Sequence, residues 1–295
     1  MRVGQSMTEV VGRTPVVQLH RVVPEGAADL FVKLEWFNPT GSYKDRMALA
    51  MITEAERRGD LRPGMTVLEY TAGSTGSSLA YVCAAKGYHF KVVTSDAFAP
   101  EKLATMAALG AELTIVKSVG GKITPDLTPR MIETARELAA DPDVYWTDQL
   151  RNTDSLVGYH QVGVELLEQL QHPIDVFCCA VGTSGMATGV RNAFDEAGNS
   201  ARVVIFEPDS SPVISTGHAG VNSVEGIGIG MVPPMLELDR FDEIRAISQD
   251  GAFAMARRLA AEEGLLAGAS TGLNVLGAIE LAREIGEGKT VVTLA

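Results

Sequence analysis

The sequence predicts an α/β protein made of mostly parallel, twisted sheets that are covered by helices on both faces. Short apolar runs of strand length alternate with longer runs of helical periodicity along most of the 295 residues. Apolar strands that each lead into a helix are typical of parallel sheets buried on both faces. Three of the strand-to-helix junctions are rich in glycine and hydroxyl residues, which indicates ligand-binding loops at one edge of a sheet.

The expected elements follow the apolar runs and the turn residues between them. Strands are expected at residues 16–19, 30–34, 65–70, 90–94, 113–116, 174–181, 203–207 and 290–294. Helices are expected at residues 76–86, 100–109, 129–140, 155–170, 186–196, 251–263 and 271–285. One further helix is expected to begin near residue 44. Residues 208–240 are rich in glycine, serine and proline and are predicted to be irregular.

The length of the chain and one break in the pattern indicate two lobes. The alternation of strands and helices is interrupted between about residues 145 and 152. We expect a smaller α/β lobe at residues 38–147 and a larger α/β lobe formed by residues 1–37 and 148–295. The sequence stops at Ala295, directly after a predicted core strand, which points to a truncated C-terminal tail.

Composition argues against several classes of protein. The net charge is −12 and Lys and Arg form no cluster, which argues against a nucleic-acid partner. No apolar run reaches the roughly 18 residues of a membrane span, and residues 1–6 lack the apolar core of a signal peptide. Cys83, Cys178 and Cys179 have the spacing of neither metal ligands nor a disulfide framework. We therefore expect a protein of the reducing cytoplasm with no membrane partner and no metal site.

Lys44 lies in the most unusual stretch of the chain. Residues 38–46 read Asn-Pro-Thr-Gly-Ser-Tyr-Lys-Asp-Arg, a turn followed by a helix in which Ser42 and Asp45 resemble a capping box. The positive end of the helix dipole and burial would both lower the pKa of this lysine. A neutral lysine is a nucleophilic amine that can form a Schiff base with a carbonyl. From this stretch alone, a solvated structural lysine is the simpler explanation.

Three glycine-rich loops suggest a ligand with several anchoring points. They read Thr-Ala-Gly-Ser-Thr-Gly at residues 71–76, Gly-Thr-Ser-Gly-Met-Ala-Thr-Gly at 182–189 and Gly-Ala-Ser-Thr-Gly at 268–272. Each loop would direct free backbone N–H groups and small hydroxyls at an anion beyond the strand ends. A single loop of this kind is common in α/β proteins, so the inference rests on all three together.

Several familiar motifs are absent. The sequence contains neither a P-loop nor the G-x-G-x-x-G dinucleotide fingerprint. Residues 268–272 match the nucleophile elbow of hydrolases, but no histidine or aspartate follows Ser270, so a hydrolase triad is excluded.

The lysine after Asn-Pro-Thr-Gly-Ser, followed by these loops in this order, resembles the cysteine synthase (O-acetylserine sulfhydrylase) and cystathionine β-synthase family. The likeness includes residues 12–19, 224–228 and 264–268 and so runs along nearly the whole chain. The resemblance implies the tryptophan-synthase-β-like fold of type II pyridoxal-phosphate (PLP) enzymes. It also implies that PLP lies in the cleft between the lobes, that the smaller lobe is mobile and that the enzyme is a homodimer.

The resemblance also implies a role for each motif. Lys44 would be the catalytic residue, which binds PLP through a Schiff base and then moves the substrate's α-proton. Ser270 would face the pyridine nitrogen, and the loop after residue 181 would hold the phosphate. The implied cofactor-binding residues are Lys44, Ser74, Gly182, Thr183, Ser184, Gly185, Met186 and Ser270. The residues implied to bind the substrate's α-carboxylate are Thr71, Ala72, Gly73, Thr75 and Gln149.

Two positions depart from the pattern of the family. Ser74 stands where the family usually has an asparagine that contacts the phenolic oxygen of PLP. The phosphate loop usually reads Gly-Thr-Gly-Gly-Thr, whereas residues 182–186 read Gly-Thr-Ser-Gly-Met. One hydroxyl is therefore lost at Met186 and one is gained at Ser184. These changes suggest a divergent branch of the family.

The resemblance implies β-replacement on a serine-derived amino acid, in which O-acetylserine and sulfide give cysteine and acetate. Members that use O-phosphoserine carry an arginine near the Gly-Ile-Gly loop, but residues 219–230 contain no basic residue and Glu225 would repel a phosphate. The alternatives are a cystathionine β-synthase, a cysteine desulfhydrase, a synthase with another sulfur nucleophile, and a non-catalytic binding protein.

Overall fold

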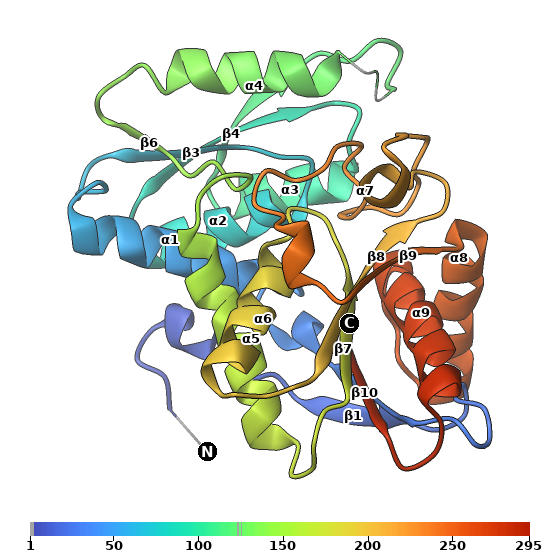
Figure 1. Ribbon diagram of the computed structural model, residues 1–295. Coiled ribbons are helices and arrows are strands. Elements are labelled where there is room, and N and C mark those ends of the chain that lie inside the picture. Colours follow the sequence, from blue (N-terminus) through green and yellow to red (C-terminus); the bar gives the residue numbers. More distant parts are fainter. Residues whose placement is uncertain (1–2, 123, 125) are drawn as a thin grey trace. The chain divides into compact units, whose positions relative to one another are not determined.

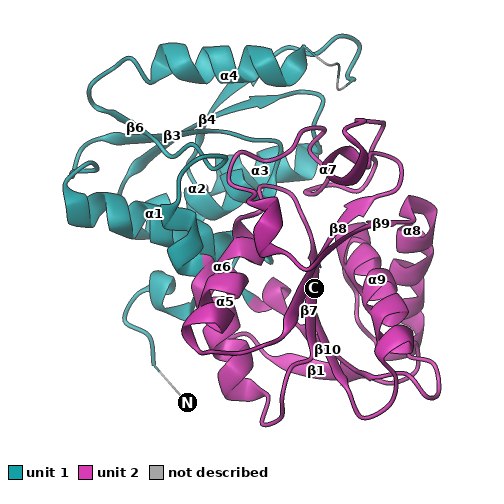
Figure 2. Ribbon diagram, viewed as in Figure 1, with its two compact units in different colours: residues 1–11, 38–158 teal, residues 12–37, 159–295 magenta. Residues whose placement is uncertain are grey.

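The computed structural model describes residues 3–122, 124 and 126–295, and these form two compact units (Figure 2). Unit 1 comprises Met1–Val11 and Asn38–Gly158, and unit 2 comprises Gly12–Phe37 and Tyr159–Ala295. The N-terminal segment joins unit 1 because the Tyr81 hydroxyl donates a hydrogen bond to the Met7 carbonyl oxygen. The expected division placed the N-terminal segment in the larger lobe and ended the smaller lobe at residue 147. In the structure, residues up to Val11 belong to unit 1, and this unit ends at Gly158.

Unit 1 is built on a four-stranded parallel sheet with the strand order β5-β4-β3-β6. Its strands are β3 (Thr66–Tyr70), β4 (His89–Ser95), β5 (Glu112–Val116) and β6 (Val144–Trp146). Its helices are the 3-10 helix η1 (Met7–Val10) and the α-helices α1 (Lys44–Arg58), α2 (Ser74–Lys86), α3 (Pro100–Ala108) and α4 (Leu127–Leu138). Helix α4 covers one face of the sheet, and α1, α2 and α3 lie on the other (Figure 1). Leu68 and Val93 of the sheet form a buried cluster with Leu127 and Met131 of α4.

Unit 2 is built on a six-stranded sheet with the strand order β1-β2-β10-β7-β8-β9, in which only the β1–β2 pair is antiparallel. Its strands are β1 (Val16–Leu19), β2 (Asp29–Lys33), β7 (Val176–Ala180), β8 (Arg202–Pro208), β9 (Glu243–Ile247) and β10 (Thr290–Leu294). Helices α5 (Asp154–Gln169), which begins in unit 1, and α6 (Gly185–Glu196) lie on one face (Figure 1). Helices α8 (Gln249–Arg258) and α9 (Ala269–Ile285) lie on the other face.

The remaining elements of unit 2 are short. They are η2 (Glu35–Phe37), α7 (Val213–Thr216), η3 (Leu238–Arg240) and the π-helical turn η4 (Leu259–Glu263), which extends α8. The core of the unit joins strand residues such as Leu30 and Val291 to α9 residues such as Leu273 and Leu281. Each such side chain, when fully buried, contributes about 2 kcal/mol of hydrophobic stabilisation.

The predicted α/β class, with mostly parallel sheets covered on both faces, is confirmed. Two strands were not predicted, and each has a physical reason. β6 has only three residues, and it lies in the segment that interrupts the sequence pattern. β9 reads Glu-Ile-Arg-Ala-Ile and lies at the edge of its sheet, so it lacks the continuous apolar run of a central strand.

The cysteines and the helices of the structure bear on two of the expectations above. Cys83, Cys178 and Cys179 are buried and form no disulfide. Among the described residues, no helix is both long enough and apolar enough to cross a membrane.

Candidate active site

Lys44 is the first residue of α1 and its side chain is largely buried, with 8% of the residue exposed. The turn before it is closed by the Gly41 amide, which donates to the Asn38 carbonyl oxygen at 2.8 Å. The predicted capping box is wrong. The Ser42 hydroxyl accepts from the Lys44 amide at 3.2 Å, and Asp45 instead reaches back to Thr40, whose amide and hydroxyl donate to it at 2.8 and 2.6 Å.

Burial lowers the pKa of Lys44 from 10.5 to about 8. The amine nitrogen lies 4.5 Å from the centre of the Tyr43 ring, a geometry that favours the ammonium form. Burial disfavours the charged form more strongly, because the ammonium loses its hydration. About half of these amines are therefore neutral near pH 8, which is the state that a nucleophile or a general base needs.

The Lys44 turn is tied to α2 within unit 1. The Thr40 hydroxyl lies 3.3 Å from the hydroxyl of Ser78, which has no exposed surface. Since α2 starts at Ser74, this contact holds the lysine turn against the helix that follows the predicted carboxylate loop.

The predicted carboxylate loop connects β3 to α2. The Thr71 hydroxyl accepts from the Gly73 amide at 3.2 Å, which curls the loop before the helix begins. The Thr75 hydroxyl is buried and donates to Gln149 Oε1 at 2.7 Å. The structure thus brings Gln149 to Thr75 although 74 positions separate them in the sequence.

The other predicted members of this loop differ in exposure. Ala72 is exposed, Gly73 is buried and Ser74 is half-buried. A Cβ atom at Gly76, the last residue of the loop, would lie 2.8 Å from Cγ2 of Thr71 and would overlap the buried Met106. A larger residue at this position would therefore have to displace the side chains of Thr71 and Met106.

The predicted phosphate loop connects β7 to α6 in unit 2. Gly182 lies against the segment 224–228, because a Cβ atom there would lie 2.5 Å from the Gly226 carbonyl oxygen. The Gly228 amide donates to the Val181 carbonyl oxygen at 3.0 Å. These contacts place the Gly-Ile-Gly segment beside the loop, so two of the sequence motifs meet at one end of β7.

Ser184 and Thr188 carry buried hydroxyl oxygens for which no hydrogen-bond partner is found among the described residues. Ser184 precedes α6 with φ of +70°, in the left-handed region that is unusual for serine. Thr183, Gly185 and Met186 are buried beside it. Unpaired hydroxyls next to the N-terminus of a helix are suited to binding an anionic oxygen such as that of a phosphate.

Ser270 lies in the first turn of α9 and is half-buried. One turn later, the Asn274 side chain accepts from the Ala180 amide at 2.7 Å and donates to the Leu294 carbonyl oxygen at 3.1 Å. Asn274 therefore fixes the start of α9 at the carboxyl ends of β7 and β10, where the phosphate loop also begins. The sequence singled out neither residue for a role: Thr188 lies in the quoted loop 182–189 but beyond its first five residues, and Asn274 lies just after the loop 268–272.

The comparisons with known proteins indicate one family. The family model described as pyridoxal-phosphate dependent enzyme matches residues 7–295. A cysteine synthase of Staphylococcus aureus strain Mu50 is 40% identical over 291 residues, which cover 98% of this chain and 92% of the relative. This chain belongs to the pyridoxal-phosphate-dependent enzymes. The resemblance inferred from the lysine motif and the loops is thereby confirmed.

Solved structures support the same family for this PLP-dependent enzyme. A cysteine synthase from Entamoeba histolytica has a TM-score of 0.93 at 31% identity, covering 99% of this chain and 87% of that one. An O-acetylserine-dependent cystathionine β-synthase from Helicobacter pylori has a TM-score of 0.91 at 30% identity, covering 100% of this chain and 95% of that one. The predicted type II PLP fold is confirmed.

The side chains of this PLP-dependent enzyme fit its cofactor. The hydroxyls of Ser184 and Thr188, which have no partner among the residues that the structure describes, suit a phosphate. Lys44 is a buried amine that is partly neutral near pH 8. When bound, PLP acts as an electron sink that eases the loss of a proton from the substrate's α-carbon. The protein's share of the chemistry is to orient the reactants and to hold or move protons at defined atoms.

Proposed function

We propose that this enzyme is a cysteine synthase that converts O-acetylserine and sulfide into cysteine and acetate. In the reaction, the bond from Cβ to the acetate oxygen breaks and a bond from Cβ to sulfur forms. The cysteine synthase names of the relatives support this proposal. The observation that carries it is the burial of Lys44, whose lowered pKa suits an amine that takes a proton from carbon and returns it.

The proposed roles divide between the two units. In unit 1, Lys44 binds PLP and moves the α-proton, and Ser74 faces the cofactor. The substrate's α-carboxylate is bound by Thr71, Ala72, Gly73, Thr75 and Gln149. In unit 2, the cofactor's phosphate and ring nitrogen are bound by Gly182, Thr183, Ser184, Gly185, Met186 and Ser270. The contact between the buried Thr75 and the half-buried Gln149 supports the carboxylate assignment, since it places a hydroxyl and an amide side by side.

The proposed leaving group is acetate rather than phosphate. Residues 219–230, which lie along the Gly-Ile-Gly segment, contain no basic side chain. Glu225 in this segment is exposed and would repel a phosphate ester. An uncharged acetyl ester meets no such penalty.

A second candidate function differs only in the nucleophile. The similar structure from Helicobacter pylori is named for a cystathionine β-synthase that depends on O-acetylserine. A thiol amino acid such as homocysteine is therefore the alternative to sulfide for this enzyme.

Turnover of five substrate sets by the holoenzyme tests the proposal. They are O-acetylserine with sulfide, O-phosphoserine with sulfide, serine with homocysteine, O-acetylserine with homocysteine, and cysteine alone. We expect the first set to give cysteine at the highest rate. If O-acetylserine and sulfide give no cysteine while another set turns over, the proposed function is wrong. Protein that stays colourless after incubation with PLP would instead support a non-catalytic binding protein.

We also propose that the enzyme is a cytoplasmic homodimer. Three buried cysteines that form no disulfide suit a reducing compartment. Light scattering coupled to size-exclusion chromatography should give twice the mass of the chain, and the mass of a single chain would rule out the dimer.

A further inference from the structure

The segment that carries Gln149 is held by one buried carboxylate. Glu69 is the next-to-last residue of β3 and has no exposed surface. Its Oε2 accepts hydrogen bonds from the Thr147 hydroxyl at 2.7 Å and from the Gln149 amide at 2.9 Å. Its Oε1 accepts from the Tyr70 amide at 2.9 Å. The carboxylate of Glu69 therefore joins the end of β3 to the segment 147–149, which follows β6.

The backbone between the two bonded residues is strained. Asp148 has φ of +42°, in the left-handed region that residues with a side chain rarely adopt. Such a conformation persists only where the surrounding contacts impose it. The hydrogen bonds from Thr147 and Gln149 to Glu69 lie on either side of Asp148 and supply that constraint.

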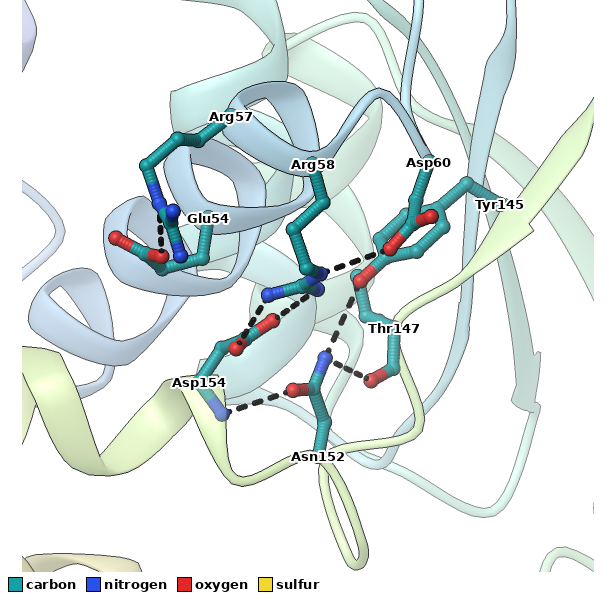
Figure 3. Close-up of polar contacts among 8 residues, drawn as sticks. All are labelled: Glu54, Arg57, Arg58, Asp60, Tyr145, Thr147, Asn152 and Asp154. Carbon is teal, nitrogen blue, oxygen red and sulfur yellow. Dashed lines mark hydrogen bonds and ion pairs between the residues drawn. The ribbon is translucent and has the colours of Figure 1, made fainter.

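Asn152 holds the same segment from its C-terminal side (Figure 3). Its side-chain nitrogen donates to the Thr147 carbonyl oxygen at 2.9 Å, and its side-chain oxygen accepts from the Asp154 amide at 3.0 Å. Arg58 in turn donates to both carboxylate oxygens of Asp154, at 2.8 and 2.6 Å. These contacts anchor the segment to α1 and α5, whereas Glu69 bonds the backbone of Gln149 itself.

The carboxylate of Glu69 is linked to the substrate loop through Gln149. Gln149 Oε1 accepts from the Thr75 hydroxyl at 2.7 Å, and Thr75 lies in the loop to which the proposed function assigns the α-carboxylate. A shift of the Gln149 backbone would break this bond and separate the hydroxyl from the amide. We propose that Glu69 is a positioning residue for substrate binding, which fixes Gln149 so that Gln149 and Thr75 meet the α-carboxylate together. This inference rests on the proposed function.

The ionised form of Glu69 suits this task, because three donors converge on its two oxygens. Burial raises the pKa of Glu69 to about 7, and the negative charge of Asp148 adds to the rise. The hydrogen bonds from Thr147, Gln149 and Tyr70 act in the opposite direction and lower this pKa. At pH 8 the side chain is mostly a carboxylate, which accepts all three bonds.

The variant Glu69→Gln tests the proposal, since an amide of the same shape leaves at least one of the three donors without an acceptor. The holoenzyme is titrated at pH 8 with O-acetylserine, without sulfide, and the change in cofactor absorbance is followed. We expect the half-saturating concentration to rise by about tenfold, because a buried donor is left unpaired and Gln149 shifts. PLP content and kcat should change much less than KM, since Lys44 and the phosphate loop are untouched.

The matched control is Glu56→Gln in the same unit. Glu56 lies in α1 and accepts from the side chains of Lys86 and Tyr88, at 2.6 and 3.0 Å. The substitution weakens a partly exposed ion pair and a hydrogen bond that have no link to the segment 147–149. We expect its half-saturating concentration to stay within about twofold of the wild-type value.

A second single variant covers the case in which Glu69→Gln does not fold. Thr147→Val keeps the shape of a buried side chain but removes one of the three donors to Glu69. It should shift the half-saturating concentration in the same direction, by about threefold. An unchanged value in a folded Thr147→Val or Glu69→Gln variant would overturn the proposal.

A double variant separates positioning from general damage. If Glu69 acts through Gln149, adding Glu69→Gln to a Gln149→Ala background should change the half-saturating concentration by less than about twofold. If the double variant instead raises the half-saturating concentration by the product of the two separate factors, the proposal is overturned. If wild-type protein responds to L-cysteine but not to O-acetylserine, the proposed function fails. The same variants titrated with L-cysteine then still decide the role of Glu69, because both compounds carry the α-carboxylate.

Discussion

Lys44 and Ser184 show how single residues depart from the average behaviour of their type. Lys44 is a buried lysine at the start of a helix, where both the surroundings and the helix dipole oppose a positive charge. Ser184 adopts a left-handed backbone conformation, and its buried hydroxyl has no hydrogen-bond partner in the part of the chain that the structure describes. Both features reduce the stability of the protein without its cofactor, which is expected where a site is arranged for a ligand.

The first prediction concerns the stability of the apoprotein between pH 8 and 10.5. Burial lowers the pKa of Lys44 to about 8, so in this window the unfolded chain binds more protons than the folded one. The free energy of unfolding should therefore rise with pH across the window. The variant Lys44→Met should lack this rise and should be more stable than wild type at pH 7 by roughly 3 kcal/mol.

Urea denaturation of apoprotein at pH 7, 8, 9 and 10 measures this difference. Equal pH profiles for wild type and Lys44→Met would show that Lys44 keeps its ordinary pKa.

The second prediction concerns Ser184→Gly. Glycine adopts φ of +70° without strain and leaves no unpaired hydroxyl, so the apoprotein should gain about 1 kcal/mol of stability. The same change removes a hydroxyl from the phosphate loop and should weaken PLP binding.

Thr188→Val is the control, because it removes a hydroxyl without relieving strain in the backbone. It should weaken PLP binding with no gain from relaxed strain. The measurements are the melting temperature of the apoprotein and the dissociation constant of PLP. Tighter PLP binding by Ser184→Gly would argue against a role for this hydroxyl.

At the scale of elements, the apolar central strands were predicted to within one or two residues, because burial on both faces leaves a continuous apolar run. β6 and β9 were missed, since a strand of three residues and a polar edge strand carry no such run. The loops proposed to form the site could be selected from their glycine and hydroxyl residues, but the residues that hold these loops in place could not. The bond between Thr75 and Gln149 spans 74 positions, and that between Glu69 and Thr147 spans 78. Spacing along the chain cannot reveal such pairs, because the fold alone brings them together.

The third prediction concerns the start of α5. Asn152 bonds the Thr147 carbonyl oxygen and the Asp154 amide (Figure 3), so Asn152→Ala leaves a helix amide and a carbonyl without partners. We expect the free energy of unfolding to fall by about 1–2 kcal/mol.

Arg57→Ala is the matched control in the same region, because Arg57 is exposed and pairs only with Glu54 among the contacts drawn in Figure 3. It should change the free energy of unfolding by less than about 0.5 kcal/mol. Equal effects of the two substitutions would show that the Asn152 bonds contribute nothing.

In the molecule as a whole, each unit has its own sheet and its own core. The overall class and the family could be predicted from the sequence, because the motifs occur in order along nearly the whole chain. The residue at which unit 1 ends could not be predicted from the sequence. Helix α5 runs from unit 1 into unit 2 as one continuous apolar pattern, so the sequence shows no break at Gly158.

The fourth prediction concerns removal of the cofactor. A ligand that binds only the folded protein raises its apparent stability in proportion to the logarithm of the ligand concentration. Protein stripped of PLP with hydroxylamine should melt roughly 5 °C below the holoenzyme, and added PLP should restore the difference. Identical melting temperatures with and without PLP would mean that the proposed ligands do not bind it.

Everything proposed for this enzyme depends on Lys44 being the residue to which PLP is bound. The most direct measurement is reduction of the holoenzyme with borohydride, followed by proteolysis and mass spectrometry of the peptides. We predict that the yellow colour is lost and that one reduced pyridoxyl phosphate group is found on the peptide that contains Lys44. The variant Lys44→Ala should carry no such group. A label on another lysine, or no label on a yellow wild-type protein, would show that PLP is not bound to Lys44.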